Sequence, residues 1–214
     1  MYDQARIDQE VDSLLQGVSL GDDLDDEQVI LLSFGLRACA TALDVGGADE
    51  WMKRGLAQGI AAEKFHEIVT LMSAIGVHVF FESSRALAAA IAPDDGWGAM
   101  DDRRQTLWDK YVGSRKYWTS MQAEIPGFLD ALLRMSPEVF EAFITFVGIP
   151  FKSQNVPILT KEIISMAADA CPSHQYLPGM RMHLKNAIRM GAGQRAIKHA
   201  MRIAAESPLH VGVS

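Results

Sequence analysis

Apolar residues recur every three or four positions along most of the chain, a spacing that places them on one face of an α-helix. Glycine or proline marks most of the breaks, among them Gly46-Gly47, Gly59 and Gly148-Ile149-Pro150. No segment alternates apolar and polar residues for long enough to be a strand. The predicted fold class is therefore all-α, with helices over residues 3–16, 25–42, 48–58, 61–90 (as one helix or two), 101–121, 127–134 and 137–147.

Three sites along this pattern have the chemistry of helix starts. Five acids in the six residues from Asp22 to Glu27 precede an apolar run, and we favour a helix start there over a metal site because acids interact well with the helix dipole. Ser136 precedes Pro137 as an expected N-cap. Thr160 is expected to cap a helix that begins at Lys161. A PDDGWG turn after residue 91 marks the middle of the chain.

The stretch from Lys161 to Ala205 holds the densest polar chemistry. Prolines and glycines divide it into three helical pieces with two breaks between them. We expect any site to lie at the first break and in the helix after it, where the sequence collects Cys171, Ser173, His174, Tyr176, Arg181, His183 and Asn186.

An internal repeat accompanies this stretch. A shift of 132 residues places Gly59 on Gly191 and Cys39 on Cys171, and it aligns apolar stripes in the helices that follow the glycines. Aligning Glu27 with Glu162 requires a shift of 135, which predicts a three-residue insertion. We therefore expect one domain, 1–214, with repeats at about 22–90 and 157–206 and a helical connector at 91–156.

The first copy has no polar counterpart to the second copy's turn. Trp51 falls opposite His183, and Ala42 falls opposite His174. The second copy is therefore the better candidate for a functional site.

Bulk composition excludes several classes of protein. The 214 residues, 49% of them apolar, suit a soluble globular protein, and the longest apolar runs, such as Ala86 to Ala92, are too short to span a membrane. The first residues lack the features of a signal peptide, so we expect a cytoplasmic protein. A formal charge of −7 argues against nucleic acid as a partner. The two cysteines have no redox or metal-ligand spacing.

The order of residues in the last third resembles the carboxymuconolactone decarboxylase family, which includes the alkyl hydroperoxidase D-like proteins. The resemblance is carried by Glu162 in a helix, His174 and Tyr176 in the turn, Pro178-Gly179, His183, and Gly191-Ala192 before a last helix. It covers about two thirds of the chain. It implies an alkyl hydroperoxidase D-like fold of two helical repeats that assembles as a trimer or hexamer.

The resemblance also implies a cofactor-independent lyase or isomerase that acts on a small carboxylated metabolite of aromatic catabolism, without a metal. Such chemistry needs an anion anchor, a proton-transfer group and stabilisation of an enolate. Arg181 and Asn186 are the expected substrate-binding residues. The expected catalytic residues are His183, His174, Tyr176 and Glu162.

The redox branch of the family has a C-x-x-C pair ahead of its histidine. Counting back from His183 places Gly179 and Tyr176 at those two positions, and neither has a thiol. Peroxidase activity is therefore disfavoured. An alternative of a different class stays open, namely a non-catalytic or ligand-binding subunit on the same scaffold. DNA binding by the helix-turn-helix pieces is a distant third, which the net charge opposes.

Self-association is expected independently of the resemblance. Residues 69–81 together with Trp97, Trp108, Trp118 and Phe143 supply more large apolar surface than short helices readily cover. The expected partners are therefore further copies of the chain and a small anionic organic substrate.

Overall fold

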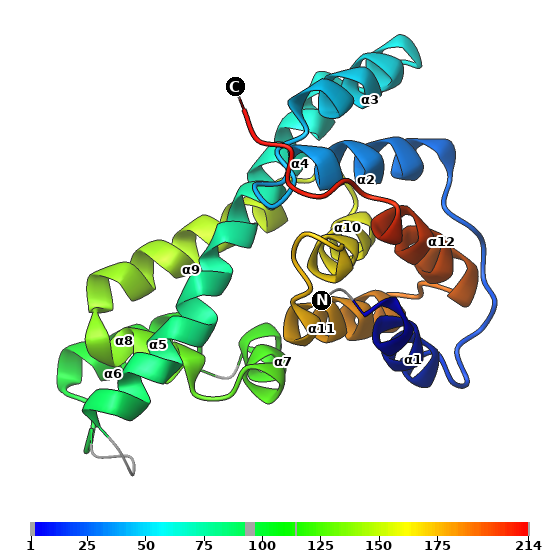
Figure 1. Cartoon of the computed structure of the whole chain (residues 1–214). Coiled ribbons are helices and arrows are strands. Elements are labelled where there is room, and N and C mark those ends of the chain that lie inside the picture. The colour runs from blue at the N-terminus through cyan, green and yellow to red at the C-terminus, as the bar shows by residue number, and fades with distance from the viewer. Residues whose placement is uncertain (1–2, 93–96, 114, 214) are drawn as a thin grey trace. The chain divides into compact units, whose positions relative to one another are not determined.

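The computed structural model describes residues 3–92, 97–113 and 115–213, and the regular structure in these ranges is helical (Figure 1). This confirms the all-α prediction. Residues 93–96 of the PDDGWG turn lie outside the described ranges. The chain divides into two compact units, one formed by residues 3–75 and 150–213 and the other by residues 76–149. The single-domain organisation stays a prediction.

The first unit holds two sets of three helices with matching lengths. One set is α2 (Asp26–Ala38), α3 (Val45–Ala57) and α4 (Ala62–Ser73). The other set is α10 (Ile158–Ala170), α11 (Leu177–Arg189) and α12 (Gln194–Ala205). Each helix begins and ends 132 residues before its counterpart, so the expected insertion is not needed and Glu162 corresponds to Ile30 rather than Glu27. A further helix, α1 (Gln4–Leu14), precedes both sets.

The turns of the two sets also match bond for bond. The Asp44 N–H donates to the Arg37 carbonyl over 3.0 Å, and the Tyr176 N–H donates to the Asp169 carbonyl over 2.7 Å. Leu43 and Gln175 both adopt positive φ, 45° and 55°, which is uncommon outside glycine. The shared backbone makes differences between the equivalent side chains informative.

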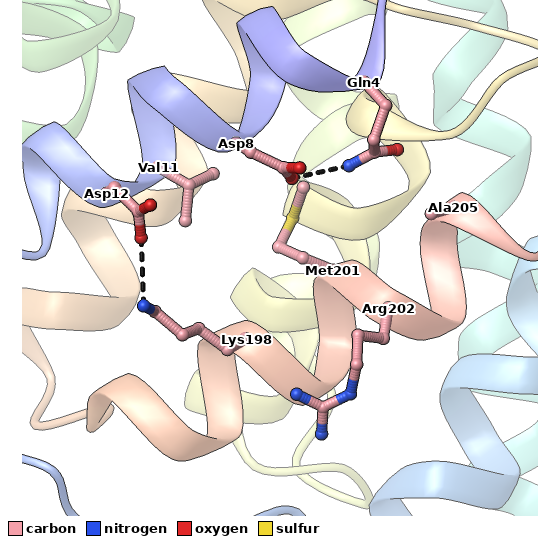
Figure 2. A pocket seen from close by; sticks show the side chains of 8 residues that line it. All are labelled: Gln4, Asp8, Val11, Asp12, Lys198, Met201, Arg202 and Ala205. Atoms are coloured by element: carbon pink, nitrogen blue, oxygen red, sulfur yellow. Dashed lines mark hydrogen bonds and ion pairs between the residues drawn. The ribbon is translucent and has the colours of Figure 1, made fainter.

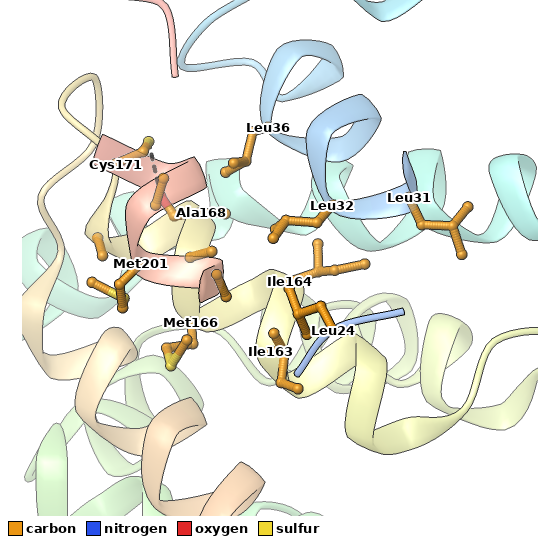
Figure 3. Close-up of a cluster of buried hydrophobic side chains, with 14 of the residues drawn as sticks. Leu24, Leu31, Leu32, Leu36, Ile163, Ile164, Met166, Ala168, Cys171 and Met201 are labelled. Carbon is orange, nitrogen blue, oxygen red and sulfur yellow. Dashed lines mark hydrogen bonds between the residues drawn. The ribbon is translucent and has the colours of Figure 1, made fainter. Parts of the chain in front are cut away.

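Helix α10 is the centre of this unit, because every residue from Thr160 to Ala170 is buried. It contacts α2, α4, α11 and α12. Figure 3 shows its apolar side chains meeting those of α2, with Met201 of α12 beside them. A central helix surrounded in this way is expected to be apolar on all sides. The three ionisable residues that α10 buries, Lys161, Glu162 and Asp169, therefore need specific partners.

Lys161 has such partners and acts structurally. Its Nζ forms an ion pair with Glu67 and donates to the carbonyls of Pro150, at 2.7 Å, and Ser153, at 2.8 Å. Glu67 also accepts from Ser153 Oγ at 2.5 Å. Burial alone would raise the pKa of Glu67, but Lys161 and Ser153 outweigh it and lower that pKa. The network fastens the chain before α10 onto α4.

Several expected boundaries were wrong for local reasons. Helix α3 begins at Val45 and includes Gly46-Gly47, because Asp44 caps it by accepting from the Gly47 N–H at 3.0 Å. Helix α10 begins at Ile158 without a side-chain cap, so Thr160 is inside it and instead accepts a hydrogen bond from Gln28 at 3.2 Å. Helix α2 stops at Ala38 rather than residue 42, because the chain turns at Cys39.

The second unit contains α5 (His78–Ile91), α6 (Asp102–Tyr111), α7 (Lys116–Glu124), α8 (Phe128–Met135) and most of α9 (Pro137–Lys152). The helix expected over 101–121 is divided by Gly113, which has a φ of 41°. Helix α9 continues through Pro150 to Lys152, because a proline in the last turn removes only one hydrogen bond near the helix end. A short 3-10 helix, η1 (Ala74–Val77), precedes α5.

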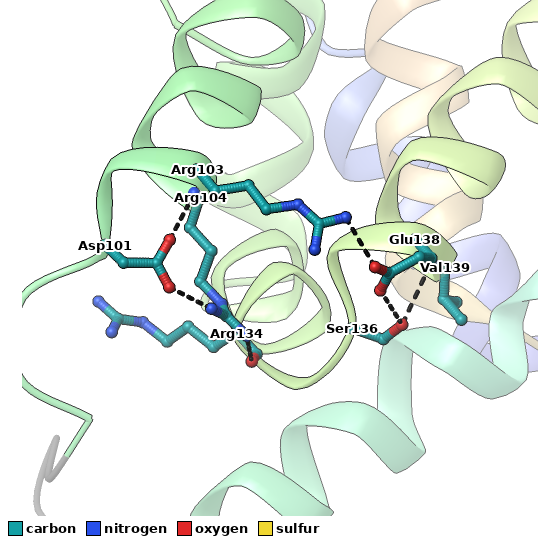
Figure 4. Close-up of polar contacts among 7 residues, drawn as sticks. All are labelled: Asp101, Arg103, Arg104, Arg134, Ser136, Glu138 and Val139. Carbon is teal, nitrogen blue, oxygen red and sulfur yellow. Dashed lines mark hydrogen bonds and ion pairs between the residues drawn. The ribbon is translucent and has the colours of Figure 1, made fainter.

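Aromatic packing and ion pairs stabilise this second unit. Phe81, Phe128 and Phe143 pack in edge-to-face and tilted pairs with ring centroids 4.5 to 5.9 Å apart. Trp118 packs against Phe143, and both side chains are buried. The expectation that these two residues add to an exposed apolar surface was therefore wrong. Figure 4 shows the polar contacts between helices, where Arg103 pairs with Glu138 at 2.6 Å. The predicted Ser136 cap of α9 is confirmed, since its Oγ accepts from the Val139 N–H at 3.2 Å.

One helical run among the described residues, Ala62–Ile91, is long and apolar enough to cross a membrane by length and composition. It has 30 residues, and 17% of its most apolar window is buried. Helices of soluble proteins also pass this test. The cytoplasmic location stays a prediction.

Candidate functional site

Glu162 and His183 form a buried pair between α10 and α11. Glu162 Oε2 lies 2.6 Å from His183 Nδ1, and it also accepts from Asn186 Nδ2 at 3.1 Å. His183 and Asn186 are three residues apart, so both lie on the face of α11 that packs against α10. Three residues that the sequence nominated separately are therefore brought into one hydrogen-bonded group.

The environment of this pair favours a charged imidazole. Burial lowers the pKa of His183, but the charge and hydrogen bond of Glu162, with a further contribution from Asp169, outweigh burial and raise the pKa above its ordinary value. Asn186 is held in turn by Arg189, which donates to its Oδ1. Glu162 is thus fixed as the acceptor of the Nδ1 proton, and His183 Nε2 is left for other chemistry.

Asp169 is a member of this cluster that the sequence analysis missed. It lies in the last turn of α10 and is fully buried. Its Oδ2 is 3.9 Å from His183 Nε2, and its Oδ1 is 3.5 Å from His174 Nε2. Burial raises the pKa of Asp169 to about 7, and the Glu162 charge adds to this, while His183 opposes it. The signal in the sequence was an acid at a helix C-terminus, where the dipole disfavours negative charge.

His174 and Tyr176 lie in the turn between α10 and α11. Burial lowers the pKa of His174 to about 4, which keeps its imidazole neutral at physiological pH. The Tyr176 ring is 6.0 Å from the His174 ring, centroid to centroid. The turn therefore places a neutral histidine and a phenol beside the buried acid.

Arg181 faces a different part of this unit. Its guanidinium pairs with Glu10 of α1 at 2.9 Å. The structure therefore does not bring Arg181 together with His183. The two residues are two positions apart on a helix, so their side chains point in directions that differ by about 200°. Its role as a substrate anchor stays a prediction.

The equivalent place in the first repeat carries a different set of side chains. Arg37, Asp44, Trp51 and Arg54 stand where the second repeat has Asp169, Tyr176, His183 and Asn186. Arg37 pairs with Asp44 at 3.4 Å, and Arg54 lies 4.9 Å from the Trp51 ring centroid. One scaffold thus holds an acid-base cluster in one copy and an arginine-tryptophan cluster in the other.

A groove of about 410 Å³ lies elsewhere in this unit, between α1 and α12 (Figure 2). Val11 and Met201 contribute apolar surface, and Lys198 pairs with Asp12 across it at 2.9 Å. The groove shares no residue with the Glu162–His183 cluster. We assign the candidate chemistry to the cluster, because its groups are buried and the pKa values of His183, Asp169 and His174 are shifted.

The fold and cluster define an all-α protein of two helical repeats with a buried acid-base site in the second. A solved crystal structure has a similar fold, with a TM-score of 0.72, 24% sequence identity, and coverage of 95% of this chain and 90% of that one. It is described as a candidate gamma-carboxymuconolactone decarboxylase subunit from Burkholderia xenovorans. At that identity the likeness shows the fold, and it agrees with the family resemblance. No protein-family model and no curated protein sequence matches the chain.

Proposed function

We propose that this protein is a carboxymuconolactone decarboxylase-like lyase or isomerase that acts, without a cofactor, on a small carboxylated metabolite of aromatic catabolism. The observation that supports this most is the buried 2.6 Å contact between Glu162 and His183. A carboxylate that holds one nitrogen of an imidazole fixes its tautomer and leaves the other nitrogen to move a proton. The fold of the similar solved protein supports the same class.

The proposed reaction uses His183 Nε2 as the proton-transfer atom. In a decarboxylation, the bond to the carboxylate carbon breaks, carbon dioxide leaves, and the electron pair forms an enolate that takes a proton from His183. In an isomerisation, the same nitrogen removes a proton beside a carbonyl and returns it elsewhere. Tyr176 is the proposed hydrogen-bond donor to the enolate oxygen.

The substrate carboxylate needs a positive partner in either reaction. The start of α11, at Leu177 and Gly179, offers backbone N–H groups and the positive end of a helix dipole. Arg181 is the proposed second anchor, and it would have to leave Glu10 to act. Replacing Arg181 is therefore expected to weaken substrate binding more than turnover.

Turnover of a panel of ring-cleavage lactones and dienoates tests this proposal. His183→Gln is expected to lower kcat roughly a hundredfold or more, and Arg181→Ala chiefly to raise KM. His199→Gln is the matched control, because His199 also pairs with an acid, Asp23 at 2.7 Å, but at a half-exposed site on another face. Equal kinetics in wild type, His183→Gln and Arg181→Ala would show that this turn is scaffold.

The alternative is a non-catalytic or ligand-binding subunit. It is favoured by Arg181, whose pairing with Glu10 leaves the predicted anchor engaged. Binding of a panel member without turnover would support this alternative.

Self-association is also proposed. Helix α5 exposes an uncharged stripe whose large members are Val79, Leu87 and Ile91, with exposed fractions of 60%, 51% and 57%. Small residues lie between them on the same face, namely Ser83, Ala86 and Ala90. Large and small side chains along one stripe suit packing against a second copy of the same helix.

A further inference from the structure

Asp169 is buried at a position where the scaffold does not require an acid. The equivalent residue of the first repeat is Arg37, on a helix of the same length that ends in the same backbone turn. Arg37 is partly exposed, whereas Asp169 has no exposed surface. Burying a carboxyl costs free energy even with partial compensation, so the turn alone does not account for this residue.

The carboxyl of Asp169 lies between two largely buried imidazoles, of which His174 is slightly the more exposed. The exposed side-chain fractions are 15% for His174, 0% for Asp169 and 10% for His183. Both contacts, 3.5 Å to His174 Nε2 and 3.9 Å to His183 Nε2, exceed a normal hydrogen bond. A carboxyl that turns between the two rings can contact each in succession.

Gly179 provides the room for this carboxyl. A Cβ built on Gly179 would overlap Asp169 Oδ2 and lie 2.9 Å from Tyr176 Cδ1. Gly179 has an ordinary φ, so a side chain at this position is prevented by the carboxyl rather than by the backbone. The first turn of α11 therefore has no room for a side chain beside the Asp169 carboxyl, and Gly47, the equivalent glycine of α3, is crowded in the same way by Arg37 and Asp44.

We propose that Asp169 carries protons between His174, on the solvent side, and His183, in the buried pair with Glu162. His174 takes a proton from water at Nδ1 as its Nε2 proton passes to the Asp169 carboxylate, which leaves hydroxide in the solvent. It then returns to the Nε2–H tautomer by exchanging its ring protons with water. Asp169 then rotates and gives its proton to His183 Nε2. This inference rests on the proposed function, because it supplies the proton that His183 delivers to the enolate, but the transfer itself takes place without substrate.

The charges around Asp169 agree with such a role. Within this unit the titratable groups near it are His174 and Tyr176 of the turn, Glu162 of α10, His183 of α11, and the Cys39 thiol at the end of α2, whose pKa the Asp169 charge helps to raise. Because burial holds the pKa of Asp169 at about 7, the carboxyl can both take and release a proton near neutral pH.

The test is the exchange of the His183 ring proton with water, measured by nitrogen-15 NMR on the full chain without substrate. Asp169→Asn keeps the shape of the side chain but cannot carry a proton. It is expected to slow exchange roughly tenfold or more at neutral pH, and His174→Gln is expected to do the same. Asp44→Asn is the control, because Asp44 is the acid of the equivalent turn and asparagine also caps helices well.

Unchanged exchange in a folded Asp169→Asn protein would overturn the proposal, and if that variant does not fold, unchanged exchange in His174→Gln would do so. Two imidazoles and a carboxylate are also ligand types of divalent metals. The proton-carrier role predicts the same exchange rate before and after treatment with EDTA, and a change on chelation would overturn it in favour of a metal site. Slowed exchange without turnover of any panel compound would refute the proposed function alone, and normal exchange with turnover would refute this inference alone.

Discussion

His174 and Asp169 have opposite protonation preferences although they lie side by side. Burial lowers the pKa of the histidine to about 4 and raises the pKa of the aspartate to about 7, so both groups favour their neutral forms. Between about pH 4 and 6.5 the unfolded chain binds more protons at His174 than the folded chain does, so this histidine makes the free energy of unfolding rise with pH. Over about the same range the folded chain binds more protons at Asp169 than the unfolded chain does, so this aspartate makes the free energy of unfolding fall with pH.

These slopes nearly cancel in the wild-type protein, and single substitutions should separate them. In Asp169→Asn, the free energy of unfolding is expected to rise between about pH 4.5 and 6.5 more steeply than in wild type. In His174→Gln it is expected to fall. In each variant the slope of the free energy of unfolding against pH differs from that of wild type by up to about 1.4 kcal/mol per pH unit, which corresponds to one proton.

Urea unfolding at several pH values measures both slopes. The raised pKa of His183 adds a loss of stability above about pH 6.5, outside this window, and this loss should be smaller in Asp169→Asn because the Asp169 charge helps to raise that pKa. Parallel curves for the three proteins would contradict the assignment of buried, neutral groups.

The two cysteines are expected to be dispensable for activity. Cys39 and Cys171 are both free and buried, and burial raises the pKa of Cys39. Such thiols behave as small apolar side chains rather than nucleophiles. Cys39→Ala and Cys171→Ala are expected to keep turnover within a few fold while lowering stability by about 1 kcal/mol. Loss of activity in a folded Cys171→Ala protein would indicate a redox role.

At the scale of helices, two glycines in the first turns of α11 and α3, Gly179 and Gly46, have different surroundings. A Cβ at Gly179 would overlap the Asp169 carboxylate, whereas a Cβ at Gly46 would have no atom within 4 Å. Gly46→Ala is expected to raise stability by about 0.5 to 1 kcal/mol, because alanine restricts the unfolded chain. Gly179→Ala is expected to lower it and to shift the chemical shift of His183. Thermal unfolding and NMR measure both, and equal effects of the two substitutions would contradict the packing described here.

Helix periodicity and turn residues predicted most of the helices, because these signals are local. The boundaries that differ depend on contacts made elsewhere, as where Lys161 takes the carbonyl of Pro150 beyond the expected end of α9. The site was predicted in part for the same reason. His183, Glu162 and Asn186 could be chosen by residue type, but the burial of Asp169 and the engagement of Arg181 by Glu10 require the packed structure.

At the scale of the molecule, the uncharged stripe on α5 predicts assembly. Leu87→Glu would place a charge in the middle of the proposed contact, so it is expected to reduce the mass in solution to that of one chain. Glu63→Gln, at an exposed position of α4 in the other unit, is the control. Light scattering at micromolar concentration measures the mass, and a monomeric wild-type protein would rule out a stable oligomer.

The order of the two repeats along the chain also sets the order in which the first unit can form. A ribosome releases α2 to α4 first, then the whole second unit, and only then α10. Leu31, Leu32 and Ile68 therefore lack their buried partners while about 90 further residues are made, from Ile68 to the start of α10 at Ile158, which takes several seconds at roughly 5 to 20 residues per second. During synthesis the half-built unit exposes the face that α10 later covers, so we expect this interval to be the period when the nascent chain depends most on chaperones.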